Sequence, residues 1–123
     1  MRIATRMDAE SFYISIAPVK VVKAMGSYVK HGIAIRYVNE RFYAYRTECP
    51  HMPGIGDLQD GEFCEKSMTV KCPAHGFKFC IESGRNKIKE LQKYGNLDIL
   101  EVMIENDCIL VKIYNERKFL QDR

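Results

Sequence analysis

The sequence predicts an all-β fold, an antiparallel sandwich or barrel, from three observations. Apolar and polar residues alternate with a period near two in F-Y-I-S-I-A, I-A-I-R-Y-V and I-L-V-K-I-Y, as in half-buried strands. Turn-forming residues recur roughly every ten residues, as in sandwiches and barrels. No segment combines a helical period, an N-cap residue and the length of a stable helix.

The length of the chain allows one hydrophobic core. Its 123 residues are the size of a single domain. We therefore expect one domain over residues 1–123, with a core at about 12–115 and short tails at both ends. Hydrophobic residues make up 46% of the chain and charged residues 28%, as in an ordinary soluble protein.

Several classes of protein are not expected. No apolar run reaches the roughly 18 residues that span a bilayer, and the N-terminal M-R-I-A-T-R-M-D-A-E lacks the apolar region of a secretory signal. The net charge is only +3 and no block rich in Lys and Arg is present, so a nucleic-acid partner is not expected. The sequence predicts a cytoplasmic protein without a membrane partner.

Two hairpins are expected from short polar connections. Residues 33–38 and 42–46 are separated by N-E-R, and L-D-I-L-E-V-M-I is separated from I-L-V-K-I-Y by E-N-D-C. Connections of this length between alternating runs are typical of hairpins.

Two further strand-like runs each end in a cysteine and a histidine. Cys49 and His51 follow F-Y-A-Y-R-T-E, and Cys72 and His75 follow S-M-T-V-K. Two thiolates and two imidazoles on paired loops suit one tetrahedral zinc ion or an iron–sulfur cluster. Zinc loops generally carry Cys-x-x-Cys. The Cys-x-His spacing therefore favours a cluster, with a zinc-binding structural domain as the alternative.

At these residues the sequence resembles the Rieske [2Fe–2S] family, in its soluble, low-potential branch of ferredoxins. The shared pattern is Cys-x-His, then Cys-x-x-His-Gly with an aromatic residue and a glycine beyond, here C-P-H, C-P-A-H-G, Phe79 and S-G. The resemblance implies a Rieske-type fold in which two cluster-binding hairpin loops form a small subdomain. It implies that Cys49 and Cys72 bind one iron and that His51 and His75 bind the other.

The resemblance also implies a low reduction potential. High-potential members tie the two loops with a disulfide and donate Ser and Tyr hydroxyls to the sulfurs. This chain has Gly54 and Ala74 at the cysteine positions, and Phe77 and Phe79 at the hydroxyl positions. Hydrogen bonds to sulfur stabilise the reduced cluster, so their absence predicts a potential at the low end of the Rieske range.

Three positions depart from the family pattern. Pro53 stands where the family commonly has glycine, Leu58 comes about two residues late, and Cys80 stands at the usual position of an aspartate. Proline has no N–H to donate, so we expect altered loop geometry with the same four ligands.

The resemblance implies a one-electron carrier rather than an enzyme, without catalytic residues and monomeric. It would pass electrons from a flavin-dependent reductase to a terminal oxygenase or reductase, which would dock transiently near His51 and His75. The alternatives are a small electron-transfer subunit of a larger reductase and a cluster-based redox sensor. A Rieske oxygenase needs a second iron site with two further histidines, whereas only His31, at a turn in K-H-G, is left.

Three cysteines remain outside the motifs: Cys64, Cys80 and Cys108. An odd number at irregular spacing is a poor disulfide framework. We expect each to be a buried small hydrophobe or a reduced thiol rather than a ligand.

The two loops carry opposite charge. Residues 71–93 contain six basic side chains against two acidic ones, whereas the segment after the first loop carries Asp57, Asp60, Glu62 and Glu65. If a partner approaches His75, Lys78 and Arg85 lie near its route. The charge pattern therefore predicts a partner with an acidic patch, with a solvated hairpin as the alternative.

Overall fold

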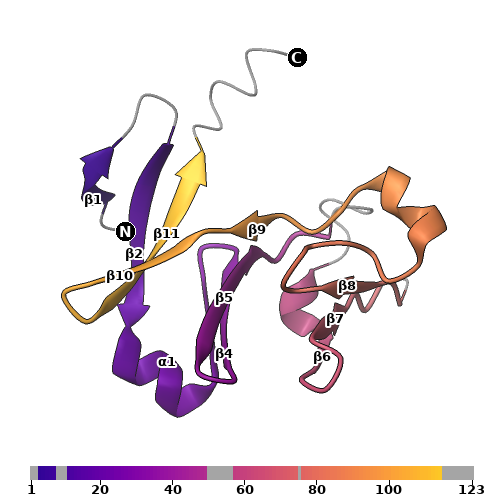
Figure 1. The fold of residues 1–123 in the computed structure, drawn as a ribbon, viewed down its shortest axis with the longest axis horizontal. Helices are drawn as coiled ribbons and strands as arrows, with labels where there is room; N and C mark the ends of the chain where they lie inside the picture. Colours follow the sequence, from indigo (N-terminus) through magenta and orange to yellow (C-terminus); the bar gives the residue numbers. More distant parts are fainter. Residues whose placement is uncertain (1–2, 8–10, 50–56, 75, 115–123) are drawn as a thin grey trace.

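The computed structural model describes residues 3–7, 11–49, 57–74 and 76–114 (Figure 1). The strands are β1 (Ile3–Met7), β2 (Ser11–Pro18), β3 (Ser27–Lys30), β4 (Ile33–Val38), β5 (Arg41–Arg46), β6 (Glu62–Cys64), β7 (Thr69–Lys71), β8 (Lys78–Cys80), β9 (Ile99–Leu100), β10 (Val102–Glu105) and β11 (Cys108–Tyr114). The helices are α1 (Val19–Met25) and two 3-10 helices, η1 (Leu58–Asp60) and η2 (Lys89–Tyr94).

The strands form three antiparallel sheets, which confirms the predicted all-β fold. Two sheets have four strands, in the orders β1-β2-β11-β10 and β3-β4-β5-β9, and the third has the order β6-β7-β8. Figure 1 shows the three-stranded sheet at one end of the molecule, beside β4 and β5. The expected single domain over residues 1–123 stays a prediction, because the structure describes only part of that range.

A first core lies between the two four-stranded sheets. Ile14 and Ile16 of β2 and Ile109 and Val111 of β11 meet Ile35 of β4, and all are at most 4% exposed. The three predicted strands are present, but β4 and β11 are not half-buried as expected, because each buries three successive residues.

A second core lies on the opposite face of β4 and β5. Ala34 of β4 and Tyr45 of β5 pack with Val70 of β7 and Phe79 of β8. Successive side chains of a strand point to opposite faces, so Ile35 enters the first core and Ala34 enters the second. This pair of strands is the shared wall of both cores.

Arg36 links the shared wall to the three-stranded sheet. Its Nε donates a hydrogen bond to the Tyr45 hydroxyl at 3.2 Å, and its guanidinium lies 4.2 Å from the centre of the Phe63 ring on β6. A guanidinium over an aromatic face is attracted by the ring quadrupole. One side chain thus contacts both walls of the second core.

Both predicted hairpins are present, with one correction. The β4–β5 turn has Asn39 and Glu40 at φ 51° and 63°, and the β10–β11 turn has Asn106 and Asp107 at φ 52° and 62°, values that match the right-handed twist of paired strands. The expected strand L-D-I-L-E-V-M-I is wrong as one element, because it divides at Glu101. β9 pairs with β5, and β10 pairs with β11 in the other sheet.

A short helix departs from the expectation that no segment is helical. α1 follows Pro18 and ends at Gly26, whose φ of 79° is the left-handed conformation typical of a helix end. Seven residues are too few for an isolated helix, but Val22 is fully buried in the first core. Among the described residues, no helix is long and apolar enough to cross a membrane.

Gly84 holds the end of the second motif against the second core. Its φ is 80°, its N–H donates to the Cys80 carbonyl, and its carbonyl accepts from the Leu97 N–H. A Cβ at this position would overlap the Leu97 carbonyl oxygen and lie 2.9 Å from Ile99. The position therefore requires glycine for both its conformation and its space.

We expect Gly84→Ala to destabilise the protein more than Gly26→Ala. The left-handed conformation alone costs an L-residue about 1–2 kcal/mol, and both glycines have a φ near 80°, but nothing lies within 4 Å of a Cβ at Gly26. The difference between the two variants in the free energy of unfolding, measured by urea denaturation, isolates the contact with Leu97. Equal losses of unfolding free energy in the two variants would show that the Leu97 segment moves away from the new Cβ without destabilising the protein.

Candidate metal centre

The base of the first motif loop is closed by three backbone contacts. Thr47, which is buried, donates its N–H to the Gly32 carbonyl at 2.9 Å and accepts the Leu58 N–H at 2.7 Å. Glu48 forms a β-bridge with Asp57, whose carboxylate caps η1 by accepting the Gln59 N–H at 2.8 Å. The chain thus leaves β5, carries Cys49 and returns beside its starting point.

The base of the second motif loop is closed within the β7–β8 hairpin. The Cys72 N–H donates to the Phe77 carbonyl, and the Gly76 N–H donates to the Cys72 carbonyl, both at 2.8 Å. Gly76 has a φ of 74°, a left-handed conformation that few other residues adopt at low cost. The predicted position of Cys72 directly after a strand is confirmed, since β7 ends at Lys71.

The structure brings the two motif cysteines together. Cys49 and Cys72 are both 0% exposed and belong to the same apolar cluster, which includes Leu58, Phe79 and Ile81. Neither forms a disulfide with another described residue. Leu58, which comes about two residues later than in the family pattern, is fully buried in that cluster.

The two motif histidines, His51 and His75, lie outside the described residues, as do Pro53 and Gly54. Among the residues that the structure does describe, no group of three or more potential metal ligands comes together. His31 is exposed at the turn between β3 and β4, which agrees with its predicted solvated position.

The described donors fit a [2Fe–2S] cluster. Thiolates are the sulfur ligands of such clusters, and here one thiol from each loop is buried, unoxidised and held in an apolar surrounding. The side chain of Asn86 also agrees with a bound group, because its buried nitrogen has no hydrogen-bond partner among the described residues. The sequence reasoning missed Asn86, since an asparagine two residues after a glycine looks like an ordinary turn residue.

The remaining cysteines differ from one another. Cys64 is exposed, whereas Cys80 and Cys108 are half-buried, and none of the three forms a disulfide with another described residue. Of the two expected alternatives, Cys64 therefore agrees with a reduced thiol and not with a buried hydrophobe. Hydrogen bonds from Ser67 lower the pKa of the Cys64 thiol. Burial acts to raise the pKa of Cys80, but hydrogen bonds from Ser83 outweigh it and the pKa is lowered.

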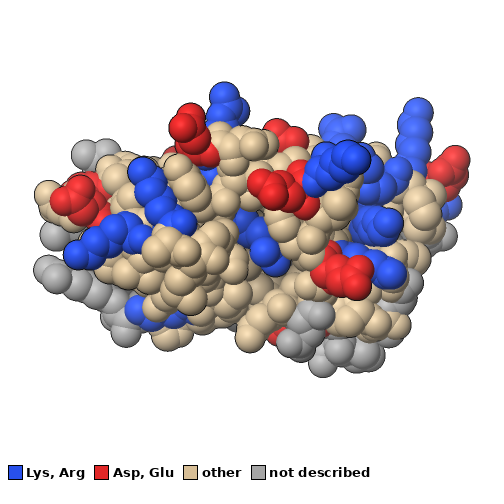
Figure 2. Space-filling model, turned by 90° about the horizontal axis from the view of Figure 1, so that it is seen from below, with Lys and Arg blue, Asp and Glu red and all other residues tan. Residues whose placement is uncertain are grey.

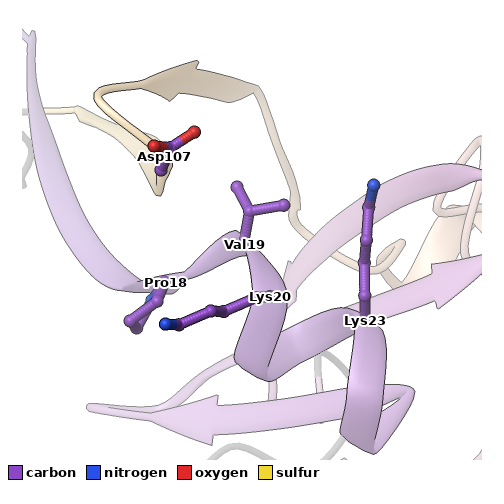
Figure 3. A pocket seen from close by; sticks show the side chains of 5 residues that line it. All are labelled: Pro18, Val19, Lys20, Lys23 and Asp107. Atoms are coloured by element: carbon purple, nitrogen blue, oxygen red, sulfur yellow. The ribbon is translucent and has the colours of Figure 1, made fainter.

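A surface pocket of about 380 Å³ lies beside α1 rather than beside the motif loops (Figure 3). Its lining residues are Pro18, Val19, Lys20, Lys23 and Asp107. They include no cysteine or histidine, so this pocket plays no part in the candidate metal centre.

Comparison with protein families identifies one model that matches more than half of the chain. The model describes the Rieske [2Fe–2S] domain and matches residues 13–101. The 3-phenylpropionate/cinnamic acid dioxygenase ferredoxin subunit of Escherichia coli (strain K12) is 36% identical over 53 residues, which cover 43% of this chain and 47% of that protein. The match thus spans about half the length of the curated relatives.

Solved structures share the fold. The ferredoxin of carbazole 1,9a-dioxygenase from Nocardioides aromaticivorans IC177 has a TM-score of 0.65 at 19% identity, over 80% of this chain and 95% of that one. A ferredoxin chain from a complex of reduced oxygenase and oxidised ferredoxin in carbazole 1,9a-dioxygenase has a TM-score of 0.63 at 22% identity, over 80% and 91%. The predicted fold class is confirmed by these neighbours.

Cys64 should be the cysteine that iodoacetamide alkylates fastest in the folded protein at neutral pH. A lowered pKa increases the fraction of reactive thiolate, and Cys64 is exposed while Cys49 and Cys72 are fully buried. Peptide mapping by mass spectrometry gives the rate at each site. We expect Ser67→Ala to slow the alkylation of Cys64 and Ser83→Ala to leave it unchanged, and equal rates in all three proteins would contradict the role of Ser67.

Proposed function

The chain belongs to the Rieske [2Fe–2S] domain family, and on that premise we propose that it is a one-electron carrier. Its cofactor is the [2Fe–2S] cluster of the family. We assign Cys49 and Cys72 to one iron, and His51 and His75 to the other. The observation that carries the proposal is that the two cysteines, which come from two separate loops, are fully buried in one apolar cluster.

The described residues exclude water and position the sulfur ligands. A bound [2Fe–2S] cluster supplies a centre that takes up and releases one electron. Leu58, Phe79 and Ile81 are all 0% exposed around the two thiols. An apolar surrounding disfavours added negative charge, which supports the expected low reduction potential.

A terminal oxygenase is the acceptor that we favour. The Escherichia coli relative is named as a ferredoxin subunit of a dioxygenase, and one solved structure is a complex of an oxygenase with a ferredoxin. By the same reasoning a flavin-dependent reductase is the proposed donor. Docking near His51 and His75, a monomeric state and a cytoplasmic location stay predictions, which cross-linking, gel filtration and cell fractionation would check.

A row of lysines supports docking at the three-stranded sheet. Lys71 of β7 lies directly opposite Lys78 of β8, and the Lys87 N–H donates to the Lys78 carbonyl at 2.9 Å. All three side chains are exposed, on the face opposite that of Val70 and Phe79. In Figure 2, Lys and Arg side chains gather at the end of the molecule where Figure 1 shows this sheet and η2.

The row of Lys71, Lys78 and Lys87 destabilises the folded state of the isolated protein. Like charges directly opposite on neighbouring strands destabilise a sheet, and Glu62, opposite Lys71 on β6, offsets part of this repulsion. The acidic segment after the first loop and the basic segment that starts at Lys71 are therefore neighbours in one sheet. They do not form two separate faces. A partner with an acidic patch would compensate the repulsion, and long-range attraction would raise the association rate.

Replacing either motif cysteine by serine should abolish the cluster. Serine removes the thiolate that iron–sulfur clusters require, and both cysteines are fully buried. Visible absorption and the EPR spectrum of the dithionite-reduced protein report the cluster. Cys64→Ser is the matched control and should keep a rhombic reduced signal.

Two results would overturn the cluster assignment. The first is a normal spectrum in Cys49→Ser or Cys72→Ser. The second is a colourless wild-type protein that contains zinc, which would favour the alternative of a zinc-binding structural domain.

Reversing two charges at the three-stranded sheet should slow electron transfer. We expect Lys78→Glu with Arg85→Glu to lower the second-order rate about tenfold at low salt, because charge attraction accelerates encounter. Stopped-flow mixing with the acceptor protein that co-purifies with the wild-type chain measures this rate. For wild type, the rate should fall as salt screens the attraction.

The matched control reverses one lysine and one arginine elsewhere. Lys20 on α1 and Arg41 at the start of β5 are both exposed, and Arg41 lies at the opposite end of its strand from Cys49. The Lys20→Glu, Arg41→Glu protein should react as wild type does. A Lys78→Glu, Arg85→Glu protein that reacts as fast as wild type at low salt would show that docking occurs elsewhere.

A further inference from the structure

Asn86 is a buried residue with one unpaired hydrogen-bond donor. It is 1% exposed. Its backbone N–H donates to the side-chain oxygen of Asn96, its carbonyl accepts from the Gln92 side chain at 3.0 Å, and its own side-chain oxygen accepts the Ile88 N–H at 2.9 Å. Only the side-chain nitrogen, Nδ2, has no partner within the part of the chain that the structure describes.

An unpaired buried amide is rare in native proteins, because water is lost and nothing replaces it. Two hydrogen bonds fix the backbone of Asn86 and the Ile88 N–H holds its side-chain oxygen, so the side-chain N–H cannot turn toward solvent without breaking the bond to Ile88. A donor held in this way indicates an acceptor that belongs to the site.

The register of the hairpin places the Asn86 side chain on the same face as Phe79. Asn86 forms a β-bridge with Phe79, and backbone hydrogen bonds of 2.9 Å flank this pair on both sides. Residues opposite each other in such a pair direct their side chains to the same face at the shortest cross-strand spacing. The Phe79 ring lies in the apolar cluster that contains Cys49 and Cys72.

The other described side chains in this row cannot donate. Phe63 and Val70 precede Phe79 in register across β6, β7 and β8, and all three are apolar. The neighbouring lysines alternate to the outer face. Asn86 is therefore the one described polar side chain in the row that faces the second core, the cluster to which both cysteines belong.

We propose that Asn86 donates its side-chain amide N–H to a sulfur atom of the cluster that Cys49 and Cys72 bind. We propose also that this hydrogen bond raises the reduction potential of the cluster. The inference rests on the proposed function, because it requires the cluster. An added electron increases the negative charge on sulfur, so a donor stabilises the reduced form more than the oxidised form. Asn86 thus replaces part of what the hydroxyls absent at Phe77 and Phe79 would supply.

The first test replaces Asn86 by leucine, which has a similar volume and no N–H. At a fixed solution potential, the ratio of reduced to oxidised cluster should fall about tenfold, equivalent to about 59 mV for a one-electron couple. Gln92→Met is the control. It removes the donor that anchors the Asn86 carbonyl and leaves the Asn86 amide intact, so the ratio should stay near that of wild type.

The second test uses the wild-type protein and does not depend on how a variant folds. Asparagine labelled with ¹⁵N at the side chain should give a weak nitrogen coupling in the pulsed EPR spectrum of the reduced cluster, since a hydrogen bond carries spin density to the donor. Loss of this coupling in labelled Asn86→Leu protein would identify Asn86 as the donor, because the other labelled asparagines remain in that variant.

The outcomes separate this inference from the proposed function. A wild-type protein without a cluster would refute the proposed function. A wild-type protein with a cluster but no asparagine coupling would refute the role of Asn86 and leave electron transfer intact. An equal change of the ratio in Asn86→Leu and Gln92→Met would also refute it, because the effect would then come from the position of the loop.

Discussion

The burial of β4 and β5 on both faces is the constraint on which the rest of the structure depends. Strands with one wet face can alternate polar and apolar residues, but these two need apolar side chains in both directions. Ile35 and Ala44 enter the first core, while Ala34 and Tyr45 enter the second. The cysteine-bearing layer is thereby attached to a wall that the other sheet already holds rigid.

This arrangement makes the metal centre a product of the whole fold. Cys49 follows the shared wall, and Cys72 belongs to the three-stranded sheet. Their separation is set by the thickness of the second core, which Arg36 spans through Tyr45 and Phe63. Close packing resists small displacements, so the second core holds both cysteines in place.

The sequence predicted what depends on local pattern and missed what depends on distant partners. The apolar, strand-like runs of β2, β4 and β11 and the two Cys-His motifs can be recognised within a few residues. In contrast, α1 is too short to form without the burial of Val22. The division at Glu101 follows from pairing with two different sheets. The orphan amide of Asn86 results from a bridge to Phe79 that local sequence does not specify.

The division of residues 99–105 between two sheets also bears on the order of synthesis. On the ribosome both cysteines emerge before Leu97 and Leu100, which complete the second and the first core, and before β11, which pairs with β2 across almost the entire chain. Such late, long-range pairing delays folding. The nascent chain therefore carries both cysteines before the residues that enclose them have been made, and the buried site can close only after β11 has paired with β2.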